Sequence, residues 1–195
     1  MSNIKPMMTT RRAIFVLVVA LLAITGTVRN SKATTSTKIA RRVVIIGVNT
    51  TLNRLFYRVP GSNDLANRAF GILVFPSIVK AGVWIGGEYG EGALRINKKT
   101  AGYYNSISAS IGFQLGVQAR SVVIMFMTPE SLASFRRKDG WKVGVDGSVA
   151  IITLGAGGAV DSNQIRQPVI GFILDEKGLM FNLTLEGSKI SRIWR

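Results

Sequence analysis

The stretch that decides the fold reads GVWIGGEYGEG over residues 82–92, directly after the apolar run GILVFP at residues 71–76. It places five glycines, two aromatic residues and two carboxylates in eleven positions. Glycine at this density indicates tight turns, bulges or close backbone approach. A nucleotide loop is disfavoured, because no Gly-Lys-Ser/Thr follows and Glu88 and Glu91 would repel phosphate. We therefore interpret residues 86–92 as a tight hairpin between two strands.

Short apolar runs separated by glycine continue from this stretch toward the C-terminus. Residues 106–117 alternate small or polar with apolar side chains, which is typical of a half-buried strand. The patterns predict strands over residues 72–75, 83–85, 93–96, 101–104, 107–117, 122–127, 143–154, 169–174 and 179–185, with a hairpin turn at residues 175–178. Strands and helices do not alternate regularly, so a doubly wound parallel sheet is disfavoured.

Three segments have helical patterns. Over residues 38–59 the apolar side chains fall on one helix face, and Pro60-Gly61 ends that helix. A second short helix is expected over residues 64–69 with Ser62 or Asn63 as its cap. The internal helix over residues 129–136 has Thr128 as its cap and Pro129 at its first position. We predict an α+β fold that is β-rich, with a curled antiparallel or barrel-like sheet, an N-terminal amphipathic helix and one internal helix.

The first 33 residues have the order of a secretory signal peptide: a basic start, a twelve-residue apolar run at residues 13–24, and small residues around a cleavage site at Ala33. That run is shorter than the roughly 20 residues that span a bilayer, although a retained membrane anchor is the alternative. We expect an exported protein, periplasmic or secreted, whose residues 34–195 form a single domain.

Composition limits the possible chemistry and the partners. The chain has no Cys and no His, which excludes thiol and imidazole catalysis and histidine-ligated metal sites. Residues 34–195 carry 20 basic and 10 acidic side chains, a net charge of +10. Such a surface attracts anionic phospholipid, polyanionic glycan or nucleic acid. Because an exported protein rarely meets nucleic acid, we expect a membrane surface as the partner and no nucleic acid.

Two further readings of the charged residues stay open. The basic side chains gather in clusters that either keep the protein soluble or form a headgroup patch, at Arg41-Arg42, Lys98-Lys99, Arg136-Arg137-Lys138 and Lys189/Arg192/Arg195. Glu88 and Glu91 could serve a two-carboxylate hydrolase, with Asp139, Asp146 or Asp161 as partners, or could bind calcium. The simpler reading places these acids in turns, and we expect no metal ion, no cofactor and no catalytic residue.

Several ordered motifs resemble the SYLF domain family, within it the exported bacterial branch related to the yeast actin-binding SYLF proteins. They comprise TLNRLF at residues 51–56, AFGILVFPSIVKAG at residues 69–82, GYYN at residues 102–105, GFQLGVQ at residues 112–118 and PVIGF at residues 168–172. The resemblance extends over residues 45–193. It implies a lipid-binding domain, with phosphoinositide and actin binding in eukaryotic members.

The resemblance also implies which residues contact lipid. The matching basic positions are Arg54 and Arg58 on the opening helix and Lys80 after the Phe-Pro-Ser motif, and the basic pair Arg41 and Arg42 joins them as candidates. The apolar stripe of the opening helix either inserts shallowly into a membrane or faces the core. We expect a non-enzymatic protein that binds anionic phospholipid. The alternative is an envelope structural module that binds another protein through strand edges.

Overall fold

The computed structural model describes residues 35–82, 85–111, 118–152, 160, 165–175 and 185–194. The predicted signal segment and most of the predicted turn at residues 175–178 lie outside these ranges. The chain divides into two compact units, residues 1–42 and 43–195. In the first unit the described residues 35–42 are helical. Everything that follows concerns the second unit unless stated otherwise.

Helices open the second unit, as predicted. Residues 43–58 are helical and are followed by α2 (Ser62–Arg68). The two helices meet at Gly61, whose φ of 87° favours glycine and where an added Cβ would lie 2.3 Å from the carbonyl oxygen of Val160. The predicted cap at Ser62 or Asn63 is wrong, because Gly61 is the N-cap and Ser62 is the first helical residue. The buried Ser62 hydroxyl instead donates to the carbonyl of Val59 at 2.6 Å.

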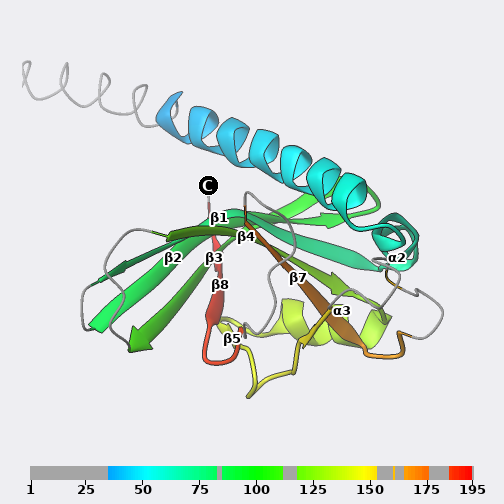
Figure 1. Cartoon of the computed structure of the whole chain (residues 1–195). Helices are drawn as coiled ribbons and strands as arrows, with labels where there is room; N and C mark the ends of the chain where they lie inside the picture. Colours follow the sequence, from blue (N-terminus) through cyan, green and yellow to red (C-terminus); the bar gives the residue numbers. More distant parts are fainter. Residues whose placement is uncertain are drawn as a thin grey trace, which may run out of the picture. The chain divides into compact units, whose positions relative to one another are not determined.

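In the part of the chain that the structure describes, eight strands form one curled sheet in the order β5-β8-β3-β2-β1-β4-β7-β6 (Figure 1). Their bounds are β1 (Gly71–Gly82), β2 (Ile85–Ile96), β3 (Lys99–Ile111), β4 (Gln118–Phe126), β5 (Trp141–Lys142), β6 (Ala150–Ile151), β7 (Val169–Leu174) and β8 (Lys189–Ile193). Neighbouring strands are antiparallel except β6 and β7, which are parallel. The predicted β-rich α+β class with a curled sheet is confirmed, and the sheet is mixed rather than purely antiparallel.

The predicted hairpin at residues 86–92 is wrong. These residues lie inside β2, which pairs with β1 on one side and with β3 on the other along its length. Close backbone approach explains Gly90 and Gly92 instead. A Cβ added at Gly92 would lie 2.1 Å from the carbonyl oxygen of Val74, and one added at Gly90 would lie 2.7 Å from that of Ser77.

A β-bulge in the middle of β1 causes this close approach. Val74 pairs with Ala93 but Ser77 pairs with Glu91, so two residues, Phe75 and Pro76, face Gly92. The same shift occurs against β4. Proline cannot donate to a sheet ladder, and a bulge is one of the few places where an interior strand accepts it. The Ser121 hydroxyl donates to the Pro76 carbonyl at 2.7 Å.

Other differences from prediction have similar causes. The strand expected at residues 101–104 and the first part of the strand expected at 107–117 are joined in β3, because the polar residues between them alternate faces; residues 112–117 lie outside the described residues. The strand expected at 143–154 is replaced by β5, a turn at residues 144–146, and β6. Strand β8 was not predicted, and most of the strand expected at 179–185 lies outside the described residues. The boundaries of β7 match the prediction.

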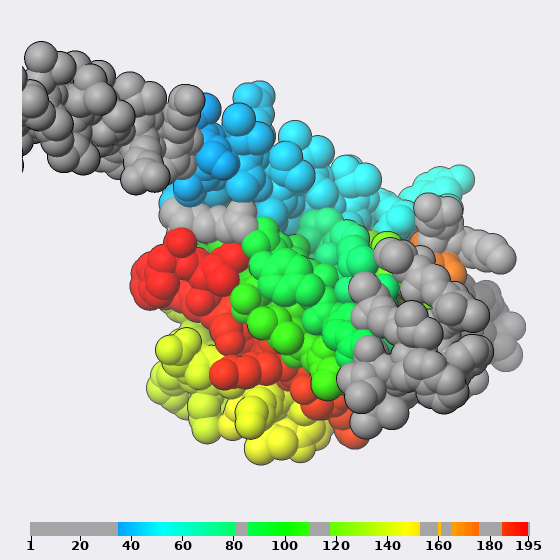
Figure 2. All heavy atoms as spheres, turned by 90° about the vertical axis from the view of Figure 1, so that its left-hand side faces the viewer, coloured from blue at the N-terminus to red at the C-terminus, as the bar shows by residue number. Residues whose placement is uncertain are grey.

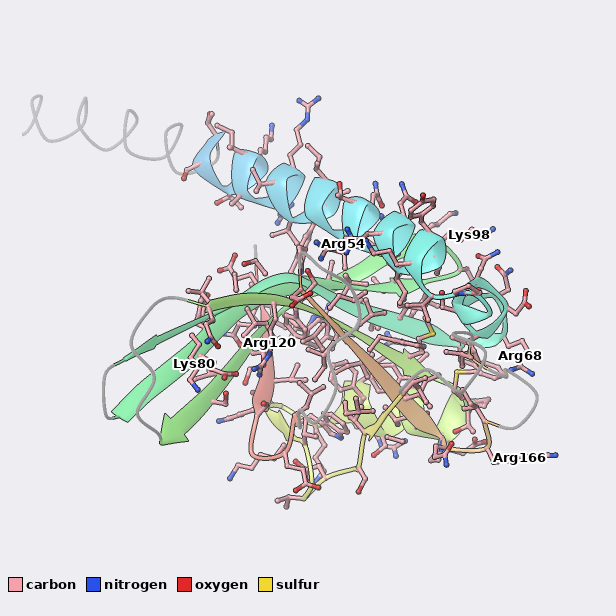
Figure 3. All side chains as sticks on the ribbon, in the orientation of Figure 1. Arg54, Arg68, Lys80, Lys98, Arg120 and Arg166 are labelled. Atoms are coloured by element: carbon pink, nitrogen blue, oxygen red, sulfur yellow. The ribbon has the colours of Figure 1, made fainter. Side chains whose placement is uncertain are left out.

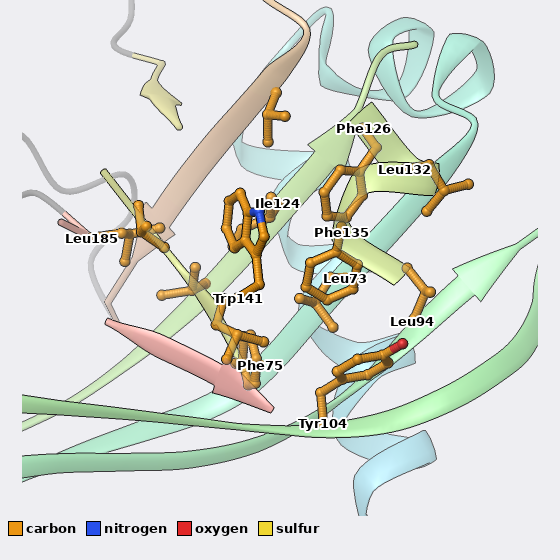
Figure 4. Close-up of a cluster of buried hydrophobic side chains, with 14 of the residues drawn as sticks. Leu73, Phe75, Leu94, Tyr104, Ile124, Phe126, Leu132, Phe135, Trp141 and Leu185 are labelled. Atoms are coloured by element: carbon orange, nitrogen blue, oxygen red, sulfur yellow. The ribbon is translucent and has the colours of Figure 1, made fainter. Parts of the chain in front are cut away.

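Helix α3 (Pro129–Arg137) packs against the concave face of the sheet and is capped as predicted, with the Thr128 hydroxyl accepting from the Ser131 amide at 3.2 Å. Aromatic rings fill this face (Figure 4). The Phe135 ring lies 4.8 Å from Phe126, 5.0 Å from Tyr104 and 5.6 Å from Trp141 between centroids. These packed rings make the aromatic core of the domain.

The opposite face of the sheet is covered by residues 43–58 and α2 (Figure 1). Its core is mainly aliphatic and includes Val48, Leu55, Leu65, Val74 and Val123, all fully buried. The helix approaches the sheet closely, since a Cβ added at Gly47 would lie 2.8 Å from the Pro76 ring. Among the described residues, no helix has the length and apolar character needed to cross a membrane.

Candidate functional site

A cavity of about 370 Å³ lies where the opening helix, α2 and the β2–β3 hairpin meet. Three elements shape it: the helix crosses the sheet diagonally, α2 turns back from it at Gly61, and the hairpin rises beside both. Its lining residues are Asn49, Leu52, Phe56, Asn63, Ala66, Asn67, Ala69, Ile72, Arg95, Asn97 and Lys98.

The lining divides into an apolar wall and a polar rim. The wall consists of five apolar side chains that are only partly buried, namely Leu52, Phe56, Ala66, Ala69 and Ile72. The rim consists of two cations, Arg95 and Lys98, and four asparagines, Asn49, Asn63, Asn67 and Asn97. Among the described residues that line it, none is Asp or Glu. Apolar contact on one side and convergent polar donors on the other is the usual composition of a small-molecule site.

Arg95 is held in place at the rim. Its Nη1 donates to the carbonyl of Lys98 at 3.0 Å, and its Nη2 donates to Oδ1 of Asn49 on the helix. A bulge just before Arg95 supports this position: Leu94 pairs with Gly102 but Arg95 pairs with Thr100, which leaves Ala101 of β3 as the extra residue. A guanidinium has five N–H donors, so Arg95 keeps donors beyond these two bonds. Its Nε has no hydrogen-bond partner among the described residues.

The β2–β3 hairpin turns through two residues, Asn97 and Lys98, with φ of 50° and 63°. Two consecutive positive φ angles identify a type I′ turn, which favours Asn or Gly. A lysine in this conformation costs of the order of 1–2 kcal/mol. The bond from Arg95 to the Lys98 carbonyl offsets part of that cost. The Lys98 backbone is thus held at the rim, and its exposed side chain extends from there.

The predicted lipid-contact residues do not gather at one place. Arg54 is half-buried and donates to the Ser121 hydroxyl, which in turn binds the Pro76 carbonyl of the bulge. Arg54 therefore joins the helix to the sheet. Arg58 is exposed near the end of the helix, and Lys80 is half-buried in β1. Lys80 lies eight residues along the strand from Ile72, roughly 26 Å from the cavity.

Arg41 and Arg42 lie on the helical residues of the first unit, where Arg41 is half-buried and Arg42 exposed. In Figure 3, Lys98 and Arg54 lie on the side of the sheet that the opening helix covers. Lys80 and Arg120 lie toward the opposite end of the sheet. The sequence identified Lys98 only as part of a basic pair and missed Arg95. The two-residue turn between the apolar runs at 93–96 and 101–104 was the available signal.

The apolar stripe of the opening helix faces the core. Val48, Leu55 and Val59 are fully buried, so the interpretation of this stripe as a membrane-inserting face is wrong. The apolar side chains that point to solvent are different ones: Val43 is 63%, Ile46 58% and Tyr57 88% exposed.

Glu88 and Glu91 do not form a carboxylate pair. They are three residues apart in a continuous strand and therefore point to opposite faces of the sheet. Glu88 is buried and accepts from Arg120 at 2.6 Å and from the Ser108 hydroxyl at 3.1 Å, while Glu91 accepts from the Tyr89 hydroxyl at 2.7 Å. The hydrolase hypothesis built on this pair loses its geometric basis.

The proposed partner Asp146 is also engaged. It accepts from the Lys142 amide at 2.8 Å and from Lys138 at 2.9 Å, and these bonds lower the pKa of its carboxyl. Among the described residues, no three Asp or Glu side chains gather as a metal site would require.

A second surface feature lies at the far end of the long strands. Val79, Tyr89 and Ile107 pair directly across β1, β2 and β3, so they share one face, and they are 39%, 49% and 49% exposed. Figure 2 views the molecule from this end, where the green atoms of these strands lie open beside the red C-terminal residues. Three half-exposed apolar side chains in one row are unusual for a solvated sheet face.

Comparison with known proteins identifies one family. Residues 107–193 match the family model Ysc84, described as "Las17-binding protein actin regulator". This match confirms the predicted resemblance to the SYLF domain over these residues, from the end of β3 to the end of β8. The cavity, built from residues 49–98, precedes the matched segment. A search of curated proteins gave no match.

Proposed function

We propose, from the match of residues 107–193 to the Ysc84 family model, that the chain is a non-enzymatic protein that binds anionic phospholipid. The family is linked to actin and lipid binding, which agrees with a binding role. The single observation that carries the proposal is the cavity, where an apolar wall adjoins a rim with two cations and no carboxylate. An amphiphile with an anionic headgroup matches both parts.

The geometry suggests how the residues divide the work. Arg95 is held by Asn49 and by the Lys98 carbonyl, so its side chain loses little conformational entropy when it binds an anion. Lys98 adds a second positive charge on a turn whose backbone conformation is set. Arg58, exposed on the helix, contributes to long-range attraction rather than to direct contact. Each cation near an anionic surface is worth about 1 kcal/mol.

Vesicle flotation tests the proposal. The full chain should float with vesicles that contain phosphatidylglycerol and stay behind with pure phosphatidylcholine, and added salt should weaken the binding. Lys98→Gln should reduce binding several-fold, whereas Lys142→Gln, which removes the same charge from β5, should have a smaller effect. Absence of binding to anionic vesicles at low salt would remove the proposal, as would equal effects of the two variants.

A second candidate function is protein binding, which the exposed row Val79, Tyr89 and Ile107 favours. The expected docking on strand edges has little support, because the edge strands β5 and β6 are two residues long in the described chain. The face of the sheet would carry the contact instead. Recovery of one protein by the parent chain but not by Tyr89→Glu, with vesicle flotation unchanged, would favour this function over lipid binding.

Export to the periplasm or to the medium remains part of the proposal. It rests on the sequence of residues 1–33 alone. Fractionation of cells that express the full chain, with mass measurement of the recovered N-terminus, tests it. A product that begins near Thr34 outside the cytoplasm is expected. An uncleaved cytoplasmic product would contradict it.

A further inference from the structure

We infer that the cavity binds a single-chain lipid whose headgroup combines a phosphate with free hydroxyl groups, the chemistry of a lysophospholipid. The inference rests on the proposed function and specifies the ligand of the same site. It depends on three observations: the volume of the cavity, the mixture of rim side chains, and the way Asn49 is oriented by Arg95.

The volume favours one acyl chain. A cavity of about 370 Å³ is near the small end of the range of roughly 300–1,000 Å³ for ligand sites. With about 30 Å³ for each water-sized group, it holds on the order of a dozen such groups. That number matches a glycerol phosphate headgroup with the first carbons of one chain, so the rest of that chain would extend beyond the cavity and a second chain would find no room. One chain segment on the wall of Leu52, Phe56 and Ile72 fits the available space.

The rim favours a phosphate over a carboxylate. Arg95 offers a planar fork of donors, and Lys98 adds a point charge from the turn that Arg95 itself holds. Two cations that converge without a neutralising carboxylate in the lining suit an ion with several acceptor oxygens and more than one negative charge. A fatty acid brings one negative charge against these two positive charges, whereas a phosphate monoester brings up to two.

The four asparagines favour hydroxyl groups beside the phosphate. Because Oδ1 of Asn49 accepts from Arg95, the NH₂ group of Asn49 is the end that remains to donate. Asn63 and Asn67 extend from α2, and Asn97 extends from the turn. Amides both donate and accept, as a glycerol hydroxyl requires, and a simple anion site would have no use for so many neutral polar groups.

The experiment measures binding of four probes to the full chain by calorimetry: lysophosphatidate, a fatty acid of the same chain length, glycerol phosphate, and phosphatidate in vesicles. Lysophosphatidate below its micelle concentration should bind one to one and at least tenfold more tightly than the fatty acid and glycerol phosphate. Ala66→Trp should fill the apolar part of the cavity and remove lysophosphatidate binding, while flotation with vesicles persists because the rim cations Arg95 and Lys98 remain. Lys98→Gln, which leaves the wall intact, should weaken lysophosphatidate binding several-fold, with Lys142→Gln as the control.

The outcomes separate the two proposals. If the fatty acid binds as tightly as lysophosphatidate, the inferred headgroup is wrong. If glycerol phosphate binds as tightly as lysophosphatidate, the site needs no acyl chain. Vesicle binding without any lysophosphatidate binding would overturn the further inference and leave the proposed function. Absence of binding to every probe would overturn both. If neither Ala66→Trp nor Lys98→Gln changes lysophosphatidate binding, the ligand binds elsewhere, and this outcome would also overturn the further inference.

Discussion

The face of the sheet under α3 and the face under residues 43–58 are built from alternate side chains of the same strands, yet they are filled differently. Aromatic rings from β3, β4, α3 and β5 interlock under α3. Mainly aliphatic side chains lie under the opening helix, and the cavity lies beside the C-terminal half of this helix. The comparison indicates that one face supplies stability and the other can accept a ligand, because interiors without voids cannot admit a guest.

The largest test of this contrast removes a ring from the aromatic core. Phe135→Ala should lower the free energy of unfolding by about 4 kcal/mol, because the fully buried ring contacts three other rings. Leu52→Ala, at the cavity wall, should cost about 1 kcal/mol since Leu52 is only partly buried. Urea denaturation measures both. Equal losses would mean that the two faces contribute alike.

The next test concerns the tightest backbone contact on the α3 side. Gly92→Ala should cost about 3 kcal/mol, because its Cβ would lie 2.1 Å from a carbonyl oxygen and 2.8 Å from the Phe75 ring. Gly87→Ala in the same strand is the matched control, since its Cβ would meet nothing nearer than 3.8 Å. Thermal melting of both variants measures the difference. A Gly92→Ala protein as stable as Gly87→Ala would contradict the bulge geometry.

A smaller effect is expected where the helix is joined to the bulge. Arg54→Met should lower the free energy of unfolding by about 1.5 kcal/mol, because it removes the charged donor to Ser121. Arg58→Met, exposed on the same helix, should change it by less than about 0.5 kcal/mol. Vesicle flotation of both variants, run beside urea denaturation, distinguishes anchoring from lipid contact. Loss of flotation with unchanged stability in Arg54→Met would return Arg54 to a lipid-binding role.

The smallest effect is a pH dependence of the aromatic core. Burial raises the pKa of the Tyr104 hydroxyl, with Arg192 and Arg136 opposing the change. Because the folded pKa is raised, the contribution to stability is complete below the ordinary tyrosine pKa of 10.0 and is lost as pH rises through the folded value. Tyr104→Phe keeps the ring and should lose less stability above that pH. Denaturation curves at neutral and alkaline pH that fall in parallel would contradict it.

The sequence predicted those parts of the fold that depend on local patterns. The capped helix after Thr128, the stop at Pro60-Gly61 and strand β7 follow from side-chain periodicity and capping, which act within a few residues. The glycines of residues 86–92 were misread because their cause is not local. Gly90 and Gly92 lie against the bulge around Pro76 on a neighbouring strand, and no single-strand pattern reports that contact.

The candidate site was less predictable for the same reason. Arg54 and Lys80 matched family positions, but the fold directs Arg54 into the bulge and places Lys80 on a distant part of β1. Arg95 had no distinguishing signal, because its role depends on Asn49, 46 residues away in the chain. A cavity arises from three elements that pack incompletely, and incomplete packing is a property of tertiary arrangement.

The bulge at Pro76 has a further consequence for how the sheet opens. Proline has no amide hydrogen and the register shifts there against both neighbours, so the ladders on either side of it are separate runs of hydrogen bonds. We therefore expect residues 77–82 to separate from β2 more readily than residues 71–75 beneath the helix. Hydrogen–deuterium exchange should find a border at this proline, with slow amides on the helix side and fast ones beyond it. The part of the sheet beside the cavity would then stay closed while the distal half of the longest strands opens.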